Sequence, residues 1–585
     1  MHLRLSSKNN VLWYLSKILL WLPWRYKTKL IYFAILLIIG AVCEIFVMLS
    51  VVPFVTILTD RESAVFLIRT HSLNIFEKIP DINIIYIYLC LFALLTTFSC
   101  IIRMLQVFIS NNISASIGTF LSCSIYRRSI LQDYQSFVSR NSSLTINTIA
   151  SHLYRTVSSL QALFYLLQST TICLAILASL ALFSPLTTFL LLILTSLVYV
   201  LLGLFSKPFF YRSSLSLKFN SQNLLSTMQE SFSAYRELVL FQKRNIFLDL
   251  YYNYDSELRK SEALVKSLSI LPRYIIEFTI FISVIAIASF SLMHPKSDTN
   301  LFSILGLLSV GTLKILPSMQ QIYGSWAGIS ATKDSIIDVF SALPKNISTP
   351  PLYIHSSNPL PVIFSKRILL DSISFAYPGS SDSVLRNLSL EFIKDKKYGL
   401  VGKSGSGKST IINIIICLLN PNSGKMLVDD ILINSANSCV VHESWQSQIS
   451  FVPQTVAIFD ASISYNITFK NSLDSIEMEL LYDVARKACL LDDINSLQDS
   501  WNTKVGERGS SLSGGQVQRI GIARALFVRR PLLILDEATS ALDFVTEKCI
   551  MNNLYDTPGL TLISISHRLS SLSQCDEIID INKIN

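Results

Sequence analysis

The sequence of 585 residues is poor in charge and lacks any cysteine framework. Only 15% of its residues are charged, 51% are hydrophobic, and the mean hydropathy is +0.47. A soluble globular protein carries about 25% charged residues, so a single soluble enzyme is excluded, and the high hydrophobicity excludes a disordered chain. None of the ten cysteines forms a CxxC pair, which argues against a zinc knuckle or a disulfide scaffold and predicts reduced thiols. No cleavable signal peptide is expected, because Lys17 and Pro23 interrupt the short first apolar stretch.

Positive charge is concentrated in the first part of the chain. Residues 1–345 hold 28 Lys and Arg against 16 Asp and Glu, and residues 346–585 hold 21 against 24. A nucleic-acid-binding face would need clustered cations on the soluble part, so no nucleic acid is expected as a partner. The net charge of +9 instead suits cationic loops that flank membrane spans.

Six apolar segments have about the 20 residues that a helix needs to cross a membrane. An even number of spans places both termini on one side, and the nine Lys and Arg of 207–269 put that side in the cytoplasm. The chain is therefore predicted to be a multi-pass protein of the cell (inner) membrane. The helix-patterned segments 107–160 and 207–269 are expected to continue the spans into the cytoplasm and turn back. The spans are 30–58, 84–106, 161–183, 186–206, 270–293 and 301–320.

Composition divides the chain into four parts. Residues 1–29 are predicted to form an interfacial elbow helix, because aromatic and cationic residues surround its apolar stretch; an ordinary surface helix is the alternative. Residues 30–340 form the α-helical six-span membrane domain, and five prolines mark 341–361 as a linker. From 362 to 585, β-branched runs alternate with helical patterns, which indicates an α/β domain with a mostly parallel sheet.

A phosphate-binding loop is the strongest motif of this second domain. It reads GxxxxGKS between a short strand at 398–401 and a helix that starts at Thr410. Its glycines let backbone N–H groups point at phosphates, which the helix N-terminus also attracts. Lys408 should reach the β- and γ-phosphates of ATP, and Ser409 should bind Mg²⁺. The residues expected to bind the nucleotide here are Gly402, Lys403, Ser404, Gly405, Ser406, Gly407, Lys408, Ser409 and Thr410.

A pair of acids follows a buried strand further on. The apolar run 532–535 ends in Asp536 and Glu537. An acid at the carboxyl end of a strand beside a phosphate loop is placed to hold Mg²⁺, which we assign to Asp536. Glu537 is the candidate general base that polarises an attacking water. Alone, such a strand is a weak signal, because many hydrophobic strands end in acids.

Between these motifs, Leu-Ser-Gly-Gly-Gln occupies 512–516, and here the sequence resembles the ABC ATPase family. This segment, after a phosphate loop and just before an Asp-Glu strand, is the signature of that family. The resemblance implies that the signature of one chain contacts the γ-phosphate held by the Lys408 of a second chain. One nucleotide domain per chain then implies a homodimer, with a heterodimer as the alternative. The signature residues assigned to the ATP site are Ser513, Gly514, Gly515 and Gln516.

Further motifs stand in the order that the family shows. The resemblance implies that Tyr377 stacks on adenine, whereas a surface aromatic is the alternative reading. It also implies that Gln454 binds Mg²⁺ and senses the attacking water, that Asp543 belongs to the nucleotide site, and that His567 contacts the γ-phosphate. Relatives continue beyond Asn585 through another strand and a helix, but the catalytic motifs are intact, so ATPase activity is expected.

Six spans ahead of one nucleotide domain resemble the exporter branch of the family. The implied fold is a type IV exporter architecture, in which a helical membrane domain precedes an α/β P-loop nucleotide-binding domain. The turns at 131–137 and 234–244 resemble coupling helices, which transmit closure of the nucleotide domains to the membrane bundle; plain loop helices are the alternative. A non-transporting ABC ATPase that acts on DNA or ribosomes is excluded by the six spans.

Charged residues inside spans are costly and are treated as functional candidates. Glu44 lies in the first span and Lys314 in the sixth. Arg273 and Glu277 share a helix face and can pair, and Arg103, near the end of its span, is expected to snorkel to the interface. With neighbouring prolines, these residues loosely resemble PglK-type flippases of lipid-linked oligosaccharides. The resemblance implies a lipid or lipid-linked saccharide as cargo, contacted by Glu44, Arg273 and Lys314.

Three alternatives stay open. Peptides or hydrophobic drugs are the second class of cargo, although a processing peptide exporter is disfavoured because about 29 residues precede the first span, too few for its protease domain. An ATP-gated pore is compatible with the same motifs. For Lys314, a structural pair with Glu44 stands beside the cargo role.

Overall fold

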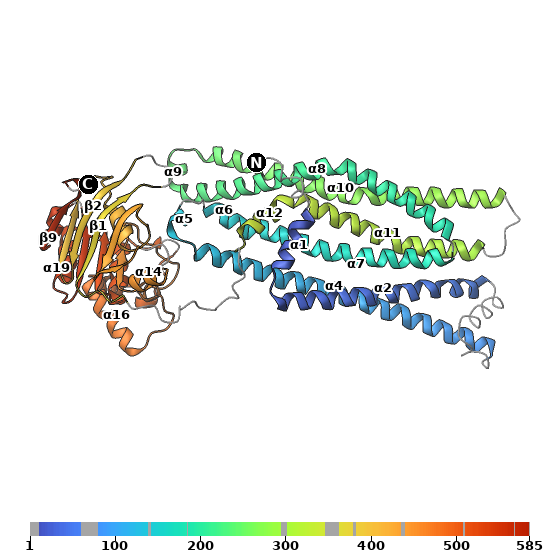
Figure 1. The fold of residues 1–585 in the computed structure, drawn as a ribbon, viewed down its shortest axis with the longest axis horizontal. Coiled ribbons are helices and arrows are strands. Elements are labelled where there is room, and N and C mark those ends of the chain that lie inside the picture. The colour runs from blue at the N-terminus through green and yellow to red at the C-terminus, as the bar shows by residue number, and fades with distance from the viewer. Residues whose placement is uncertain are drawn as a thin grey trace. The chain divides into compact units, whose positions relative to one another are not determined.

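The computed structural model describes residues 11–59, 80–138, 142–183, 185–293, 301–344, 362–377, 382–434, 439–506, 509–566 and 568–583. The chain divides into two compact units. One consists of Met1–Gln132 and Ser136–Pro350, and the other contains Pro351–Asn585. Figure 1 shows the long helices of the first unit and the sheets of the second.

Long helices that run alongside one another build the first unit (Figure 1). They are α2 (Trp24–Thr59), α4 (Asp81–Ile130), α7 (Leu153–Phe183), α8 (Pro185–Ser233), α10 (Arg244–Met293) and α11 (Leu301–Ala331). Each contains one of the predicted spans, and α4, α8 and α10 continue well beyond theirs. Within the described residues, three stretches are long and apolar enough to cross a membrane, and these are Trp24–Ile57, Asn83–Ile130 and Ser143–Leu182. The other three predicted spans lie in α8, α10 and α11, parts of which lie outside the residues to which this finding applies.

Short elements join or cover the long helices. Leu15 and Ile18 of α1 are buried, and its aromatic side chains make edge contacts with Phe340 of α12. One face of α1 is thus packed on protein, while Leu20 on another face is exposed; its position at the membrane interface stays a prediction. The short elements are α1 (Val11–Trp21), α5 (Tyr134–Val138), α6 (Ser142–Asn147), the π-helical turn η1 (Thr148–His152), α9 (Tyr235–Leu240) and α12 (Lys333–Ala342).

A buried amide fixes the packing of α2, α4 and α7. The side chain of Gln106 donates to the carbonyl oxygen of Leu36 at 2.9 Å and accepts from Gln168 Nε2 at 3.0 Å. Gly40 makes room for it, because a Cβ atom there would lie 2.2 Å from Gln106 Nε2. A buried amide needs partners wherever water is absent. These three helices are therefore held in one register by polar contacts as well as by apolar packing.

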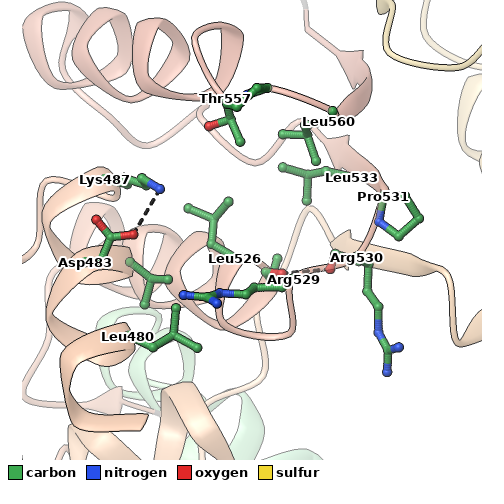
Figure 2. A pocket seen from close by; sticks show the side chains of 15 residues that line it. Leu480, Asp483, Lys487, Leu526, Arg529, Arg530, Pro531, Leu533, Thr557 and Leu560 are labelled. Atoms are coloured by element: carbon green, nitrogen blue, oxygen red, sulfur yellow. Dashed lines mark hydrogen bonds and ion pairs between the residues drawn. The ribbon is translucent and has the colours of Figure 1, made fainter. Parts of the chain in front are cut away.

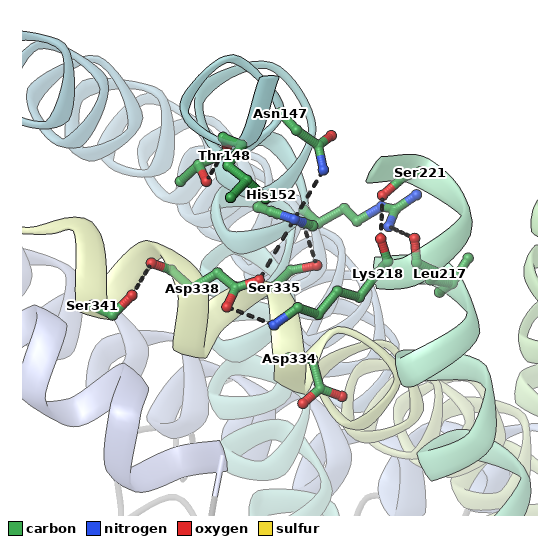
Figure 3. A network of polar contacts seen from close by, with 12 residues as sticks. Asn147, Thr148, His152, Leu217, Lys218, Ser221, Asp334, Ser335, Asp338 and Ser341 are labelled. Carbon is green, nitrogen blue, oxygen red and sulfur yellow. Dashed lines mark hydrogen bonds and ion pairs between the residues drawn. The ribbon is translucent and has the colours of Figure 1, made fainter. Parts of the chain in front are cut away.

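A second polar network joins η1, which leads directly into α7, to α8 and α12 (Figure 3). The His152 ring lies 3.1 Å from Asn147 Nδ2 and 3.1 Å from Ser335 Oγ. Asp338 of α12 accepts a hydrogen bond of 2.7 Å from Lys218 of α8 and lies 3.6 Å from His152 Nε2. The last described helix of the first unit, α12, is thus bound to two long helices that lie far from it in the sequence.

Two sheets form the centre of the second unit. The predicted parallel sheet has the strand order β6-β7-β8-β3-β9, and its strands are β3 (Lys397–Val401), β6 (Ile449–Val452), β7 (Leu532–Asp536), β8 (Thr561–Ile565) and β9 (Glu577–Asp580). An antiparallel sheet of order β2-β1-β4-β5, which the sequence analysis did not predict, accompanies it. Its strands are β1 (Arg367–Phe375), β2 (Leu385–Ile393), β4 (Ser423–Val428) and β5 (Ile431–Leu432).

The other elements of the second unit are helices. The predicted phosphate loop and Asp536 lie at the edge of the parallel sheet where β3 and β7 end. β3 and β7 both pair in parallel with β8, so the segments that follow them meet at the same edge. The apolar run of β7 is fully buried, as expected for a parallel strand with both faces covered. The helices are α13 (Lys408–Ile415), α14 (Cys439–Gln446), α15 (Ile463–Thr468), α16 (Ser475–Lys487), α17 (Leu491–Ser496), α18 (Gly514–Phe527) and α19 (Phe544–Tyr555).

Candidate nucleotide-binding site

The phosphate loop connects β3 to α13. Gly407, the residue before α13, has a φ of 93°, and no side chain caps the start of this helix. A Cβ atom at Gly407 would lie 2.7 Å from a methyl carbon of Leu385, so both space and backbone conformation require glycine. Among the described residues, Ser406 Oγ is buried without a hydrogen-bond partner. An uncapped helix start and a buried hydroxyl that lacks a partner fit the phosphates of a nucleotide.

Lys408 is held within this loop. Its ammonium group donates to the carbonyl oxygen of Gly402 at 2.8 Å and to that of Lys403 at 2.9 Å. The side chain is buried and folds back over the loop instead of extending into solvent. The cation is thus placed beside the backbone N–H groups that would hold a phosphate.

Two of the three predicted magnesium ligands, Ser409 and Asp536, are in contact at the edge of the sheet. Ser409 Oγ, in the first turn of α13, donates to Asp536 Oδ1 at 3.4 Å. Burial raises the pKa of Asp536, and the charge of Glu537 adds to this, while the hydrogen bond from Ser409 and the charge of Lys408 oppose it. Hydroxyl and carboxylate oxygens are ligands that Mg²⁺ prefers. The pair therefore fits this ion, whose charge would compensate the buried carboxylate.

Two of the three predicted catalytic residues are in contact. Gln454 Nε2 donates to Glu537 Oε2 at 2.8 Å. Glu537 has a φ of 50°, a left-handed conformation that is uncommon outside glycine and is concentrated at functional sites. The third predicted residue, His567, lies outside the described residues.

Tyr377 and Asp543 each have a partner within the chain. The Tyr377 hydroxyl lies 3.3 Å from Thr410 Oγ1 at the start of α13, and the side chain is 43% exposed. Its ring is thus beside the phosphate loop with a surface left for a base. Asp543 caps α19, where its carboxylate accepts from the backbone N–H of Thr546 at 3.0 Å. Its contact with a nucleotide stays a prediction.

The signature segment opens α18 with a reciprocal cap. The Ser513 hydroxyl accepts from the backbone N–H of Gln516 at 3.2 Å, and Gln516 Oε1 accepts from the backbone N–H of Ser513 at 2.9 Å. This capping box satisfies two backbone donors of the helix start. Gly515 lies against Ala541, since a Cβ atom there would be 3.3 Å from the Ala541 carbonyl oxygen. Ser513 and Gly514 are exposed, as a surface that meets another molecule requires.

Sequence reasoning missed the residues that fasten this signature helix. Gln518 donates to Ser540 Oγ at 3.1 Å and accepts from the backbone N–H of Ala541 at 2.9 Å. Arg519 forms an ion pair of 2.6 Å with Asp493. The sequence marks Gln518 and Arg519 only by their position directly after the signature segment. Their hydrogen-bond and ion-pair partners lie more than twenty residues away, where no local pattern identifies them.

Three charged side chains of the membrane unit meet on different helices. Glu44 of α2 is fully buried. It accepts from Lys314 Nζ of α11 at 2.8 Å, pairs with Arg103 of α4, and accepts from Ser99 Oγ at 3.3 Å. The structural pair between Lys314 and Glu44 is therefore present. The expectation that Arg103 snorkels to the interface was wrong, because the buried carboxylate holds its guanidinium.

Arg273 has a different partner. It pairs with Glu277 of its own helix at 3.0 Å, as residues four apart on a helix can. The structure thus brings together two of the three predicted cargo residues, Glu44 and Lys314, and engages the third in a local pair.

A pocket of the second unit is separate from the nucleotide site (Figure 2). It has a volume of about 410 Å³ and lies between α16, the end of α18 and the segment after α19. Asp483 and Lys487 on its wall pair at 2.9 Å. None of the predicted nucleotide-site residues lines it, so we do not count it as part of that site.

The second unit combines a phosphate loop, a strand that leads into Asp536 and Glu537, and this signature helix. Residues 385–540 match the family described as "ABC transporter". The chain is 41% identical over 217 residues to ABC transporter B family member 6 of Dictyostelium discoideum, and the aligned segment covers 36% of this chain and 31% of that protein. It is 37% identical over 217 residues to the ATP-dependent lipid A-core flippase of Aliivibrio fischeri, which covers 37% and 36%.

A further relative has a name of a different kind. The chain is 38% identical over 221 residues to the lactococcin-G-processing and transport ATP-binding protein LagD of Lactococcus lactis subsp. lactis, which covers 38% of this chain and 31% of that protein. The matched segments span about a third of the length of these relatives.

The comparison of folds covers nearly the whole chain. A solved structure of a bacterial Atm1-family ABC exporter with ATP bound matches with a TM-score of 0.74 and 21% identity, over 94% of each chain. The chain therefore has the fold of an exporter-type half-transporter, and residues 385–540 of its second unit resemble the family described as "ABC transporter".

Proposed function

We propose that the protein uses ATP to export or flip a lipid or a lipid-linked oligosaccharide across the inner membrane. Its termini and ATPase domain lie in the cytoplasm, and its cofactors are ATP and Mg²⁺. Ser409, Gln454 and Asp536 would hold the ion, which would supply charge compensation at the phosphates. Glu537, oriented by Gln454, removes a proton from the attacking water. The contacts among these four side chains support this assignment.

The proposed active form is a homodimer, with a heterodimer as the alternative. Ser513 and Gly514 are exposed at the start of α18, where the side chain and the backbone N–H groups can contact a γ-phosphate held by the Lys408 of a second copy. Within one chain the atoms nearest to Gly515 belong to Ala541 and Leu542. A second copy related by two-fold symmetry would complete two such sites at once.

The observation that carries the cargo proposal is the convergence of two cations on one carboxylate. Glu44 compensates one of the two positive charges of Lys314 and Arg103, so the cluster keeps one positive charge in excess. The Glu44 side chain is 1% exposed, whereas those of Lys314 and Arg103 are 29% and 38% exposed. The excess charge is thus on the accessible side, where it can bind an anionic headgroup such as a phosphate.

An apolar pocket in the same unit supports a cargo with a hydrophobic part. It has a volume of about 360 Å³ between α8 and α11, and its wall includes Tyr199, Met319, Tyr323 and Trp326. Such a surface offers dispersion contacts to an acyl or prenyl chain. It would also accept hydrophobic peptide side chains or a drug, which is why an exporter of peptides or drugs is the second candidate. The lipid A-core flippases among the relatives favour the first candidate, and LagD favours the second.

ATP hydrolysis in lipid nanodiscs tests the proposal. Addition of a diphosphate-linked saccharide lipid should stimulate hydrolysis by the wild type, and Lys314→Met should lose this stimulation while it keeps basal activity. Lys260→Met, at an exposed cation that pairs with Glu257, is the matched control and should respond like the wild type. Stimulation by hydrophobic peptides, with no response to the anionic lipid, would replace the first candidate by the second.

A further inference from the structure

Two cysteine thiols of the ATPase domain are in contact. Cys489 lies between α16 and α17, and Cys549 lies in α19. Their Sγ atoms are 3.0 Å apart, and the Cys489 thiol donates to the sulfur of Cys549. Both cysteines are free, and Cys549 is exposed. Sulfur atoms at this separation need to approach by about 1 Å to reach the length of a disulfide bond.

We propose that this pair is a reversible disulfide site whose oxidation slows ATP hydrolysis, an inference that rests on the proposed function. The oxidant is a low-molecular-weight disulfide. The Cys549 thiolate attacks one of its sulfurs, forms a mixed disulfide and releases one thiolate. Cys489 then loses its proton and attacks the Cys549 sulfur, so that the Cys489–Cys549 bond forms and the second thiolate leaves. Two cysteine thiols are oxidised, and the small disulfide is reduced to two thiols that take up the released protons.

Exposure and hydrogen bonding set the order of these steps. Burial, together with the hydrogen bond and charge of Cys549, raises the pKa of Cys489 to about 12. Cys549 is exposed and accepts the Cys489 proton, so it is the sulfur that a small disulfide reaches first. Once Cys549 forms a mixed disulfide, its sulfur no longer carries charge. The contribution of the Cys549 charge to the raised pKa of Cys489 then disappears, which favours the attack of Cys489 on the Cys549 sulfur.

Cys489 is linked to the signature helix by a short chain of polar contacts. Its carbonyl oxygen accepts from the guanidinium of Arg519 in α18. The same guanidinium lies 2.6 Å from Asp493 Oδ2, and Asp493 Oδ1 accepts from Gln516 Nε2 at 3.3 Å. Gln516 in turn caps α18 at Ser513. A bond that fixes Cys489 therefore restrains the signature segment.

Cys549 belongs to a helix that is fastened elsewhere. Glu547, two residues before it in α19, is buried and accepts hydrogen bonds of 2.7 Å from Thr539 Oγ1, Ser571 Oγ and Arg568 Nη1. Because Thr539 follows β7, and the other two follow β8, α19 is tied to the segments that leave the parallel sheet. Cys549 is thus part of the sheet side of the domain and Cys489 is part of the signature side, and Gln518 joins the two sides elsewhere through Ser540 and Ala541.

The boundary between these two sides is incompletely packed. The pocket in Figure 2 opens between Lys487 of α16 and Thr557, just after α19. One hydrogen bond crosses the boundary nearby, from Asn553 Nδ2 to the Lys487 carbonyl oxygen at 3.0 Å. Unfilled space at this place allows the segment that holds Cys489 to shift against α19, and a covalent bond would prevent that shift. This is why oxidation should slow turnover and leave the domain folded.

The experiment uses the full chain in nanodiscs. The protein is incubated with oxidised glutathione, its remaining thiols are alkylated, and its peptides are analysed by mass spectrometry beside a measurement of ATP hydrolysis. We expect the peptides that contain Cys489 and Cys549 to be linked, with the loss of two hydrogen atoms, and ATP hydrolysis to fall; dithiothreitol should reverse both. Cys489→Ser and Cys549→Ser should show neither change. Cys575→Ser, which removes a thiol that faces the Tyr555 hydroxyl at 3.3 Å, should behave like the wild type.

The two parts of the inference fail separately. If the linked peptides are absent while Cys549 is fully converted to a mixed disulfide, the site is wrong. If the linked peptides form and hydrolysis is unchanged, the regulatory role is wrong. A reduced wild type that hydrolyses no ATP contradicts the proposed function instead, and the peptide masses still decide whether the disulfide forms.

Discussion

The side-chain amide of Gln454 donates a hydrogen bond of 2.8 Å to a carboxylate oxygen of Glu537. Gln454 follows β6 and Glu537 follows β7, and these strands are neighbours in the parallel sheet. The register of two adjacent strands therefore sets the position of the candidate general base. A side chain oriented in this way by a neighbour is suited to proton transfer in one defined direction.

Glu537→Gln should abolish most turnover and leave ATP binding intact. The amide keeps the shape of the side chain but cannot accept the proton of the attacking water, and loss of one general base costs a factor of about 10²–10⁴ in rate. Phosphate release and the binding of a fluorescent ATP analogue measure the two effects. Glu479→Gln, at an exposed acid of α16, is the control. Hydrolysis at the wild-type rate in Glu537→Gln would show that another residue is the base.

Asp536→Asn should stabilise the nucleotide-free protein and inactivate it. Burial raises the pKa of Asp536 above its ordinary value of 3.8, and the charge of Glu537 adds to the effect. A carboxyl group whose pKa is higher in the folded than in the unfolded protein stabilises the fold at a pH below its pKa in the unfolded state. This stabilisation is lost as the pH rises through its pKa in the folded state. At neutral pH the ionised Asp536 is therefore destabilising, and the neutral amide removes this cost.

Thermal unfolding as a function of pH measures this effect. The midpoint of Asp536→Asn should exceed that of the wild type at pH 7, and the difference should narrow as the pH falls toward 3.8. Magnesium-dependent hydrolysis should be lost in parallel. A lower midpoint for the variant at pH 7 would contradict the destabilising role of the buried charge.

Glu44→Gln should destabilise the membrane unit more than Lys314→Met does. Without Lys314, the Glu44 carboxylate still has Arg103 and Ser99 as partners, whereas Glu44→Gln leaves two cations without their anion. Removal of one partner of a fully buried pair costs about 3–5 kcal/mol, and the partial exposure of both cations reduces this figure. Thermal midpoints in detergent compare the variants. Equal midpoints, or a lower one for Lys314→Met, would show that the carboxylate is not the centre of the cluster.

Phe137→Ala and Glu237→Ala should separate ATP hydrolysis from transport. These side chains lie on α5 and α9, inside the two predicted coupling segments, and both are exposed. Exposed positions tolerate truncation with little loss of stability, so basal hydrolysis should persist while transport into proteoliposomes falls. Lys260→Met again serves as the control. An unchanged number of cargo molecules transported per ATP would remove these segments from the coupling path.

Local patterns were sufficient to predict the long helices and the edge of the sheet that holds the site. The apolar runs delimit the spans, and the phosphate loop together with Asp536 had to meet because both follow strands of one parallel sheet. The antiparallel sheet was not predicted, because the pairing of β1 with β4, which joins its two pairs of consecutive strands, links segments that lie far apart in the sequence. The ion pair of Arg103 with Glu44 and the contact of Cys489 with Cys549 were missed for a related reason. A single sequence does not indicate which of several long or reactive side chains meet across helices.

The polar network at α12 has a mechanical consequence. Asp338 is held by Lys218 of α8 and lies beside His152 of η1, which leads into α7, while the chain joins α12 to α11 through Thr332. A tensile force applied at the end of α12 is therefore divided among three long helices. Charge-assisted contacts of this kind resist separation in a defined direction. Displacement of α12 is thus expected to move α7, α8 and α11 together, as one rigid body.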